Sequence, residues 1–165
     1  MRSNALEPSL IIQRPLPNIL DGATRYETVL YSARVTSPTY NTVDDFSSWL
    51  DAVLAKRLPA EVQAFCFNLY DGIAQTWDFQ LAGTREFAEN DSEWAAHPIF
   101  LCAEVLFIPK DKIGVQWEQA LSVAIELVST YLRAGTHRDI LRRLLGVAVG
   151  FVDGDLTILW PHSAA

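Results

Sequence analysis

Apolar residues recur every three or four positions in two stretches of the chain, and this spacing predicts two long helices. The first begins at Thr42 and ends before Pro59, and the second runs from Trp117 to Arg133. The second helix carries only a narrow strip of polar residues, so it must be covered over most of its circumference. A short helix is expected from Thr136 to Leu145. The apolar stripe of the first helix consists of Phe46, Trp49, Leu50, Val53 and Leu54.

Large apolar residues at every second position predict an antiparallel pair of strands at residues 65–69 and 77–81, and in the second strand Asp78 and Gln80 lie between them. Asp71-Gly72 begins the turn between them. The polar positions of both strands share one face, which is typical of a sheet with one solvated side. Further strands are expected over Tyr26–Val35 and over Ile99–Ile108, and the second of these is expected to be largely buried.

The C-terminal segment contains Asp153-Gly154 between two apolar runs, a pair favoured in two-residue hairpin turns because both positions take positive φ. Such a turn fixes the pairing of the flanking strands. All the large apolar side chains would then share one face of the hairpin. The expected pairs are Phe151 with Leu156, Val149 with Ile158, and Val147 with Trp160.

Together these elements predict an α+β fold, with a mainly antiparallel sheet of five or six strands and helices packed on one face. A chain of 165 residues suits one domain, which we expect to span residues 24–165. Residues 1–23 show no sustained period and contain Pro8, Pro15 and Pro17. We therefore expect them to form an extended or poorly ordered N-terminal arm.

The negative net charge of the chain argues against some classes of binding partner. Thirteen Lys and Arg stand against 20 Asp and Glu, which gives a net charge of −7. Nucleic acid and anionic membranes attract positive charge, so we expect neither as a partner. No apolar stretch approaches the roughly 20 residues of a membrane-spanning helix, and no export signal is recognisable, so a cytoplasmic location is expected. Cys66 and Cys102 lie in apolar runs, as reduced, buried thiols usually do.

Motifs of catalysis and cofactor binding are not recognisable in the sequence. There is no Gly-rich phosphate loop, no nucleophile elbow and no Cys/His metal spacing. His97, His137 and His162 lie in separate segments. We therefore predict no catalytic residue, no cofactor and no metal site.

The segment from Glu86 to Trp94 is the candidate partner-binding segment, because it mixes carboxylates with Phe87 and Trp94. Carboxylates attract a basic partner, and a partly exposed tryptophan anchors interfaces. The alternative is a surface loop whose aromatic rings pack into the core and whose acids are merely hydrated. The candidate residues are Glu86, Glu89, Asp91, Glu93 and Trp94.

Several segments resemble small acidic bacterial proteins of the polymorphic-toxin immunity type. They are residues 67–72 (FNLYDG), Trp77 with Gly83-Thr84, residues 91–94 (DSEW) and residues 146–160 (GVAVGFVDGDLTILW). The resemblance covers roughly residues 65–160. It implies a single-domain α+β protein that blocks a cognate toxin by occluding its active surface, and it carries over no catalytic residue.

Three classes of function stay open. The favoured one is a non-catalytic binding protein, such as an immunity protein that occludes a basic toxin through an acidic surface. The second is a small enzyme with an unrecognised site that uses Asp78, Glu104 or His97. The third is an oligomeric regulatory domain whose hairpin or long helix pairs with a second copy.

Overall fold

The computed structural model describes residues 11–15, 26–30 and 41–161. The chain divides into two compact units, Met1–Thr39 and Tyr40–Ala165. In the first unit, β1 (Ile11–Pro15) pairs antiparallel with β2 (Tyr26–Leu30). The strand predicted from Tyr26 is therefore present up to Leu30, and residues 31–35 of that prediction lie outside the described residues. The strand β1 lies within the segment expected to be an extended arm.

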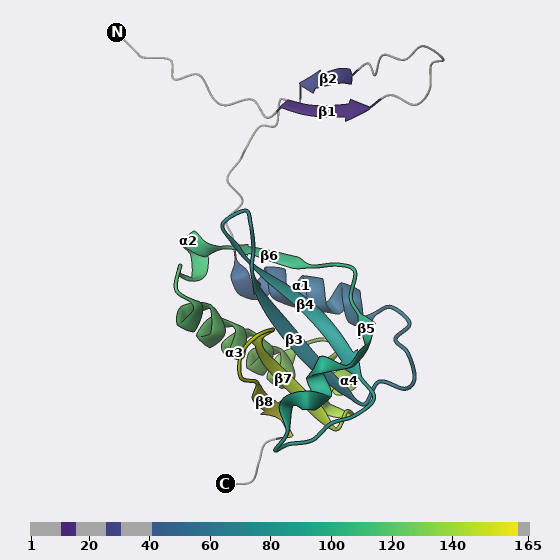
Figure 1. Cartoon of the computed structure of the whole chain (residues 1–165). Helices are drawn as coiled ribbons and strands as arrows, with labels where there is room; N and C mark the ends of the chain where they lie inside the picture. Colours follow the sequence, from purple (N-terminus) through teal and green to yellow (C-terminus); the bar gives the residue numbers. More distant parts are fainter. Residues whose placement is uncertain (1–10, 16–25, 31–40, 162–165) are drawn as a thin grey trace. The chain divides into compact units, whose positions relative to one another are not determined.

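The second unit is built on a six-stranded sheet with the order β5-β4-β3-β7-β8, in which β6 also pairs with β4 (Figure 1). Strands β3 and β7 are parallel, and the other pairs are antiparallel. The predicted α+β fold with a mainly antiparallel sheet is confirmed. The strands are β3 (Ala64–Asp71), β4 (Thr76–Thr84), β5 (Pro98–Leu101), β6 (Leu106–Pro109), β7 (Gly146–Phe151) and β8 (Thr157–Trp160).

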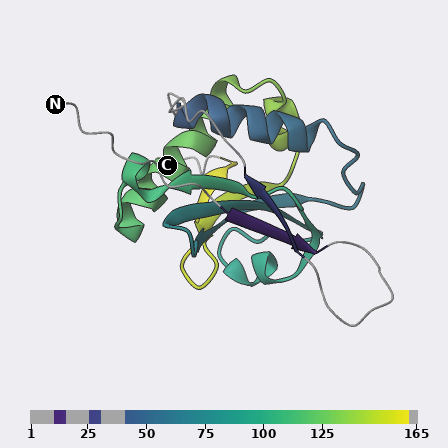
Figure 2. The same cartoon turned by 90° about the horizontal axis from the view of Figure 1, so that it is seen from above.

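Helices cover one face of this sheet. In Figure 2, α1 (blue) and the helices α3 and α4 (green) lie on one side, while the short 3-10 helix η1 (teal) lies on the other. The two long helices agree closely with the sequence prediction, and the predicted apolar stripe of α1 packs against the sheet. The helical segments are α1 (Thr42–Leu54), η1 (Ser92–Ala96), α2 (Lys110–Ile113), α3 (Trp117–Ala134) and α4 (Arg138–Arg142).

The single buried strand predicted over Ile99–Ile108 is wrong. The structure has two short strands there, β5 and β6, and both pair with β4. The chain turns away between them at Cys102, whose amide donates to the carbonyl of Leu81 at 2.8 Å. Leu101 and Phe107 are exposed, and they pair with Ala82 and Asp78 of β4 at this edge of the sheet.

The predicted register of the C-terminal hairpin is correct only in part. Val147 pairs with Trp160 as predicted, but a bulge after Val147 shifts the later pairs, so that Val149 faces Thr157 instead of Ile158. A shift of one residue turns a side chain to the opposite face of the sheet. The connection between the strands spans residues 152–156, which is longer than the predicted two-residue turn. As a result, Leu156 and Ile158 pack on one face of the sheet, while Val147 and Val149 pack on the opposite face.

Candidate functional site

A separate cluster of buried residues lies on the sheet face away from the helices. Its floor consists of small side chains on the central strands, and the indole of Trp94 in η1 covers this floor. Small side chains on flat neighbouring strands leave room for a large ring. The exposed fraction of Trp94 is 5 %, so the expectation of a partly exposed interface anchor is wrong for this residue. The floor residues are Ala64, Cys66, Ala82 and Ala148.

The ring of Phe87 packs against the sheet near the start of the candidate segment, residues 86–94. It lies 5.3 Å from the ring of Trp94, centroid to centroid. It also lies against the backbone of Gly146, where an added Cβ would come within 2.1 Å of the Phe87 ring. The two aromatic residues of the candidate segment therefore fasten it to the sheet. This agrees with the alternative in which the rings pack inward.

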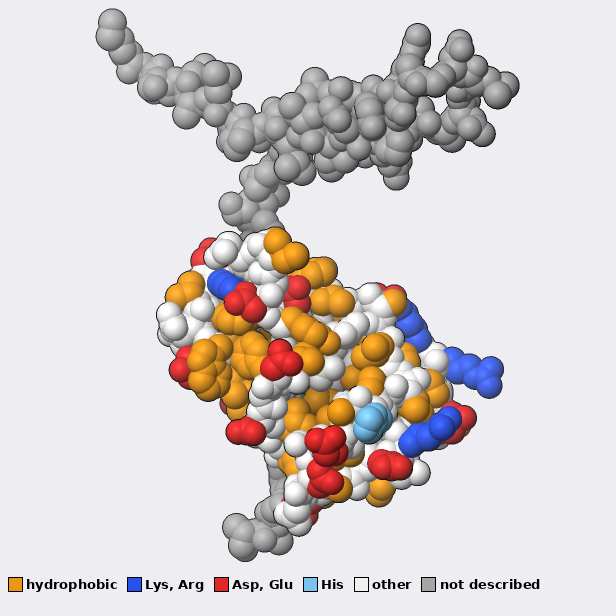
Figure 3. Space-filling model, viewed as in Figure 1, with side chains coloured by type: hydrophobic (Ala, Val, Ile, Leu, Met, Phe, Trp, Pro, Cys, Tyr) orange, Lys and Arg blue, Asp and Glu red, His pale blue; other side chains and the backbone are white. Residues whose placement is uncertain are grey.

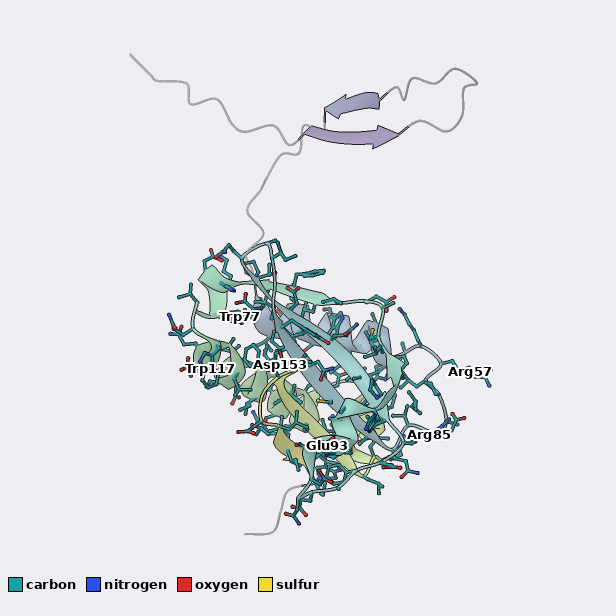
Figure 4. All side chains as sticks on the ribbon, viewed as in Figure 1. Arg57, Trp77, Arg85, Glu93, Trp117 and Asp153 are labelled. Atoms are coloured by element: carbon teal, nitrogen blue, oxygen red, sulfur yellow. The ribbon has the colours of Figure 1, made fainter. Side chains whose placement is uncertain are left out.

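The carboxylates of the segment point to solvent, while the ring of Trp94 is buried and that of Phe87 is half-buried. Glu86, Glu89, Asp91 and Glu93 are all exposed. The Asp91 carboxylate accepts a hydrogen bond from the Glu93 amide at 3.0 Å and thereby caps η1. Figure 4 shows Glu93 on this face of the molecule, where Figure 3 shows a group of acidic side chains.

The connection between β7 and β8 contributes a further carboxylate to this surface. Glu89 and Asp91 line a hollow of about 320 Å³, and Asp155 with Leu156 lines its other wall. Trp94 contributes to the lining of the same hollow. We call Glu89, Asp91, Glu93 and Asp155 the acidic surface.

A larger groove adjoins the acidic surface and shares Asp155 with it. Its volume is about 850 Å³, and it lies between the ends of β3 and β7, the start of β4 and the start of α3. Trp117 and Val152 stand at its edge with exposed fractions of 54 % and 52 %. Figure 4 shows Trp77, Trp117 and Asp153 on this side, where Figure 3 shows a hydrophobic patch bordered by acidic side chains. We call this hollow the aromatic groove; the side chains that give its character are Tyr70, Asp71, Trp77, Trp117, Phe151, Asp153 and Asp155.

The wall of the aromatic groove is ordered by a small network. The Trp77 indole donates to the carbonyl of Gly114 at 2.7 Å, and Gly114 adopts a φ of +105°. The Phe151 ring meets the rings of Trp77 at 5.5 Å and Trp117 at 6.3 Å, edge to face. These contacts connect the start of α3 to the sheet.

No family model, curated protein or solved structure matches this chain.

The residues considered for an enzyme site are not brought together. Asp78 accepts a hydrogen bond from Thr76 at 2.6 Å, and His97 is exposed after the end of η1. The hydrogen bond from Lys56 lowers the pKa of the Glu104 carboxyl. Among residues 11–15, 26–30 and 41–161, no group of three or more His, Cys, Asp or Glu side chains could hold a metal ion. His162 lies outside these ranges.

The two thiols are structural. Cys66 lies beneath Trp94, and burial raises its pKa to about 12. Burial also raises the pKa of Cys102, and the Cys102 thiol donates to the Glu104 carboxylate at 3.2 Å. Both are therefore protonated thiols at neutral pH, and a protonated thiol is a poor nucleophile. Both are free cysteines, outside any disulfide, and both are buried, as predicted.

The acids of the candidate segment are evident from the sequence, but the aromatic groove is not. The sequence predicts Trp117 as the first residue of a helix and Asp153 as part of a hairpin turn, and neither pattern indicates a groove. The one available signal was the excess of carboxylates around Gly154 in an otherwise apolar segment. In the part of the chain that the structure describes, no helix combines the length and the apolar character that crossing a membrane requires.

Proposed function

We propose that this chain is a non-catalytic binding protein that engages a basic protein partner through the acidic surface. The observation that supports it is the convergence of two loops around one hollow, with Glu89 and Asp91 from one loop and Asp155 from the other. The loop that carries Glu89 and Asp91 is held by the buried ring of Trp94 and the half-buried ring of Phe87, so its carboxylates need little reordering on binding. With a net charge of −7, the surface attracts positively charged partners.

A toxin is the partner class that agrees best with this chemistry and with the resemblance to immunity proteins. An immunity protein works by covering a surface, which requires a rigid complementary face and no reacting groups. Toxins that cleave nucleic acid carry basic clefts for phosphate groups. Carboxylates on a folded surface would occupy such a cleft in place of the phosphate groups. A cytoplasmic location belongs to this proposal.

The test is binding to the product of the gene adjacent to the one that encodes this chain. Isothermal titration should give a complex at or below micromolar concentration, which weakens as salt is added. The double variant Glu89→Lys/Glu93→Lys should weaken the complex by about tenfold or more, mainly through slower association. Both side chains are exposed, so the fold should be preserved.

The matched control is Glu126→Lys/Asp139→Lys, which makes the same change in net charge on exposed positions of α3 and α4. We expect it to change affinity by less than about threefold, because only long-range attraction is reduced. Two results would remove the proposal: no complex at micromolar concentration, or an equal loss of affinity in both double variants.

A further inference from the structure

We infer that the aromatic groove receives a lysine or arginine side chain of the protein partner, which lies on Trp117 with its charge near Asp153 and Asp155. This inference rests on the proposed function and names the side chain that the partner would insert. It concerns a different set of residues from the acidic surface, apart from the shared Asp155.

The apolar part of the groove suits the stem of such a side chain. Trp117 and Val152 are both more than half exposed, although they lie beside the buried core residues Leu69 and Trp77. Exposed large apolar groups at a hollow mark binding sites more often than isolated ones do. Lysine and arginine carry aliphatic stems that cover apolar surface while the charged end reaches polar groups. The groove offers apolar side chains for the stem and carboxylates for the charged end.

The charged part of the groove lacks a partner within the chain. Among the described residues, the side chains of Asp153 and Asp155 make no hydrogen bond and no ion pair. Asp71, by contrast, is already paired with Lys110. Covering Asp153 and Asp155 with an apolar surface would desolvate them without compensation, which is unfavourable. A cation is therefore the complement that this groove requires.

The wall of the aromatic groove already contains one cation that lies on an indole ring and pairs with a carboxylate. The ammonium of Lys110 lies 4.3 Å from the centre of the Trp77 ring and pairs with the carboxylate of Asp71. A cation over an indole face is attracted by the π-electrons of the ring. Trp117 and Asp153, an indole and a carboxylate, both line the groove and are both exposed. A side chain of the partner would complete the second pair.

A second copy of this chain is a less suitable occupant. Each copy carries a net charge of −7, so two copies repel each other before any contact forms. The test below also measures self-association, because a dimer formed through Trp117 would overturn the inference.

The first experiment is a titration of the ¹⁵N-labelled chain with the blocked peptides Ac-Ala-Arg-Ala-NH₂, Ac-Ala-Lys-Ala-NH₂ and Ac-Ala-Glu-Ala-NH₂. The two basic peptides should shift the indole N–H of Trp117 and the amides of residues 151–155, and the acidic peptide should not. Trp117→Ala and Asp153→Asn should each weaken binding by about threefold or more, as expected for one exposed cation–π or charge contact.

Matched controls separate the groove from general effects. Leu145→Ala removes a side chain with the same exposed fraction as Trp117, 54 %, at the opposite end of β7. Asp139→Asn removes one exposed charge from α4. Both variants should bind the basic peptides like the parent chain. Shifts located elsewhere, equal shifts with the acidic peptide, or a concentration-dependent dimer lost in Trp117→Ala would overturn the inference.

The second experiment applies the same variants to the complex with the product of the adjacent gene. Trp117→Ala should weaken this complex by about tenfold or more, mainly through faster dissociation, because tryptophans that become buried on binding are common hot spots of interfaces. A complex that is unaffected by Trp117→Ala and Asp153→Asn would overturn the inference but leave the proposed function standing. Basic peptides in the groove without any complex would remove the proposed function, while the preference of the groove for cations would stand.

Discussion

Replacing Trp94 with alanine tests whether the buried indole holds the acidic surface in place. The ring lies on small side chains from the central strands and contacts Phe87. Truncating a buried aromatic side chain costs about 3–5 kcal/mol, through lost burial and the cavity that remains. The strands beneath cannot rise to fill this cavity, but the loop above can settle. We therefore expect the lower end, about 3 kcal/mol.

Such a loss is smaller than the roughly 5–15 kcal/mol that stabilises a typical domain, so the variant should remain folded. Urea denaturation followed by far-UV circular dichroism measures the free energy of unfolding, and hydrogen exchange should become faster across residues 85–97. Trp117→Ala is the control, because that side chain is more than half exposed and its loss should cost clearly less than the loss of Trp94, about 1 kcal/mol. A loss below about 1 kcal/mol in Trp94→Ala, or unchanged exchange across residues 85–97, would refute this reasoning.

Two further substitutions test the surrounding framework. Gly114→Ala places a Cβ at a φ of +105°, within 2.2 Å of the Gln119 side chain, and should lower the free energy of unfolding by about 1–3 kcal/mol in thermal denaturation. Gly154→Ala, whose Cβ would meet nothing closer than 3.4 Å, should change it by less than about 1 kcal/mol, and equal losses in the two variants would contradict the argument. Tyr131→Phe removes a hydroxyl that donates to Asp51 and accepts from the His137 amide, at a cost of about 1–2 kcal/mol. Burial raises the pKa of Tyr131 above its ordinary value of 10.0, so this stabilisation is complete below pH 10 and declines above it; equal pH dependence of the parent chain and the Phe variant above pH 10 would contradict this assignment.

The helices could be predicted because their signals are local. The apolar stripe of α1 and the stop at Pro59 lie within a few turns of one another, and the same is true of α3 up to Gly135. Residues at such spacing share one helix face whatever the rest of the chain does. The β3–β4 hairpin has the same local character, because its turn and its alternation lie together in the sequence.

The errors arose where pairing depends on distant residues. The bulge in β7 after Val147 and the break between β5 and β6 are set by contacts with other strands, which periodicity does not contain. The burial of Trp94 has the same origin. An aromatic residue in an acidic segment is compatible with either a surface anchor or a buried one, and the small side chains of β3, β4 and β7 decide between them.

The same small side chains explain why the acidic surface can be both charged and rigid. Exposed carboxylates repel one another and favour an expanded loop, so an acidic segment needs an apolar anchor to keep one conformation. Trp94 and Phe87 supply that anchor on the face of the sheet opposite α1 and α3. Because a preformed surface loses little conformational entropy on binding, the anchor should contribute to affinity without touching the partner. Affinity for a basic partner should therefore fall in Trp94→Ala as well as in Glu89→Lys/Glu93→Lys, with slower association only in the second.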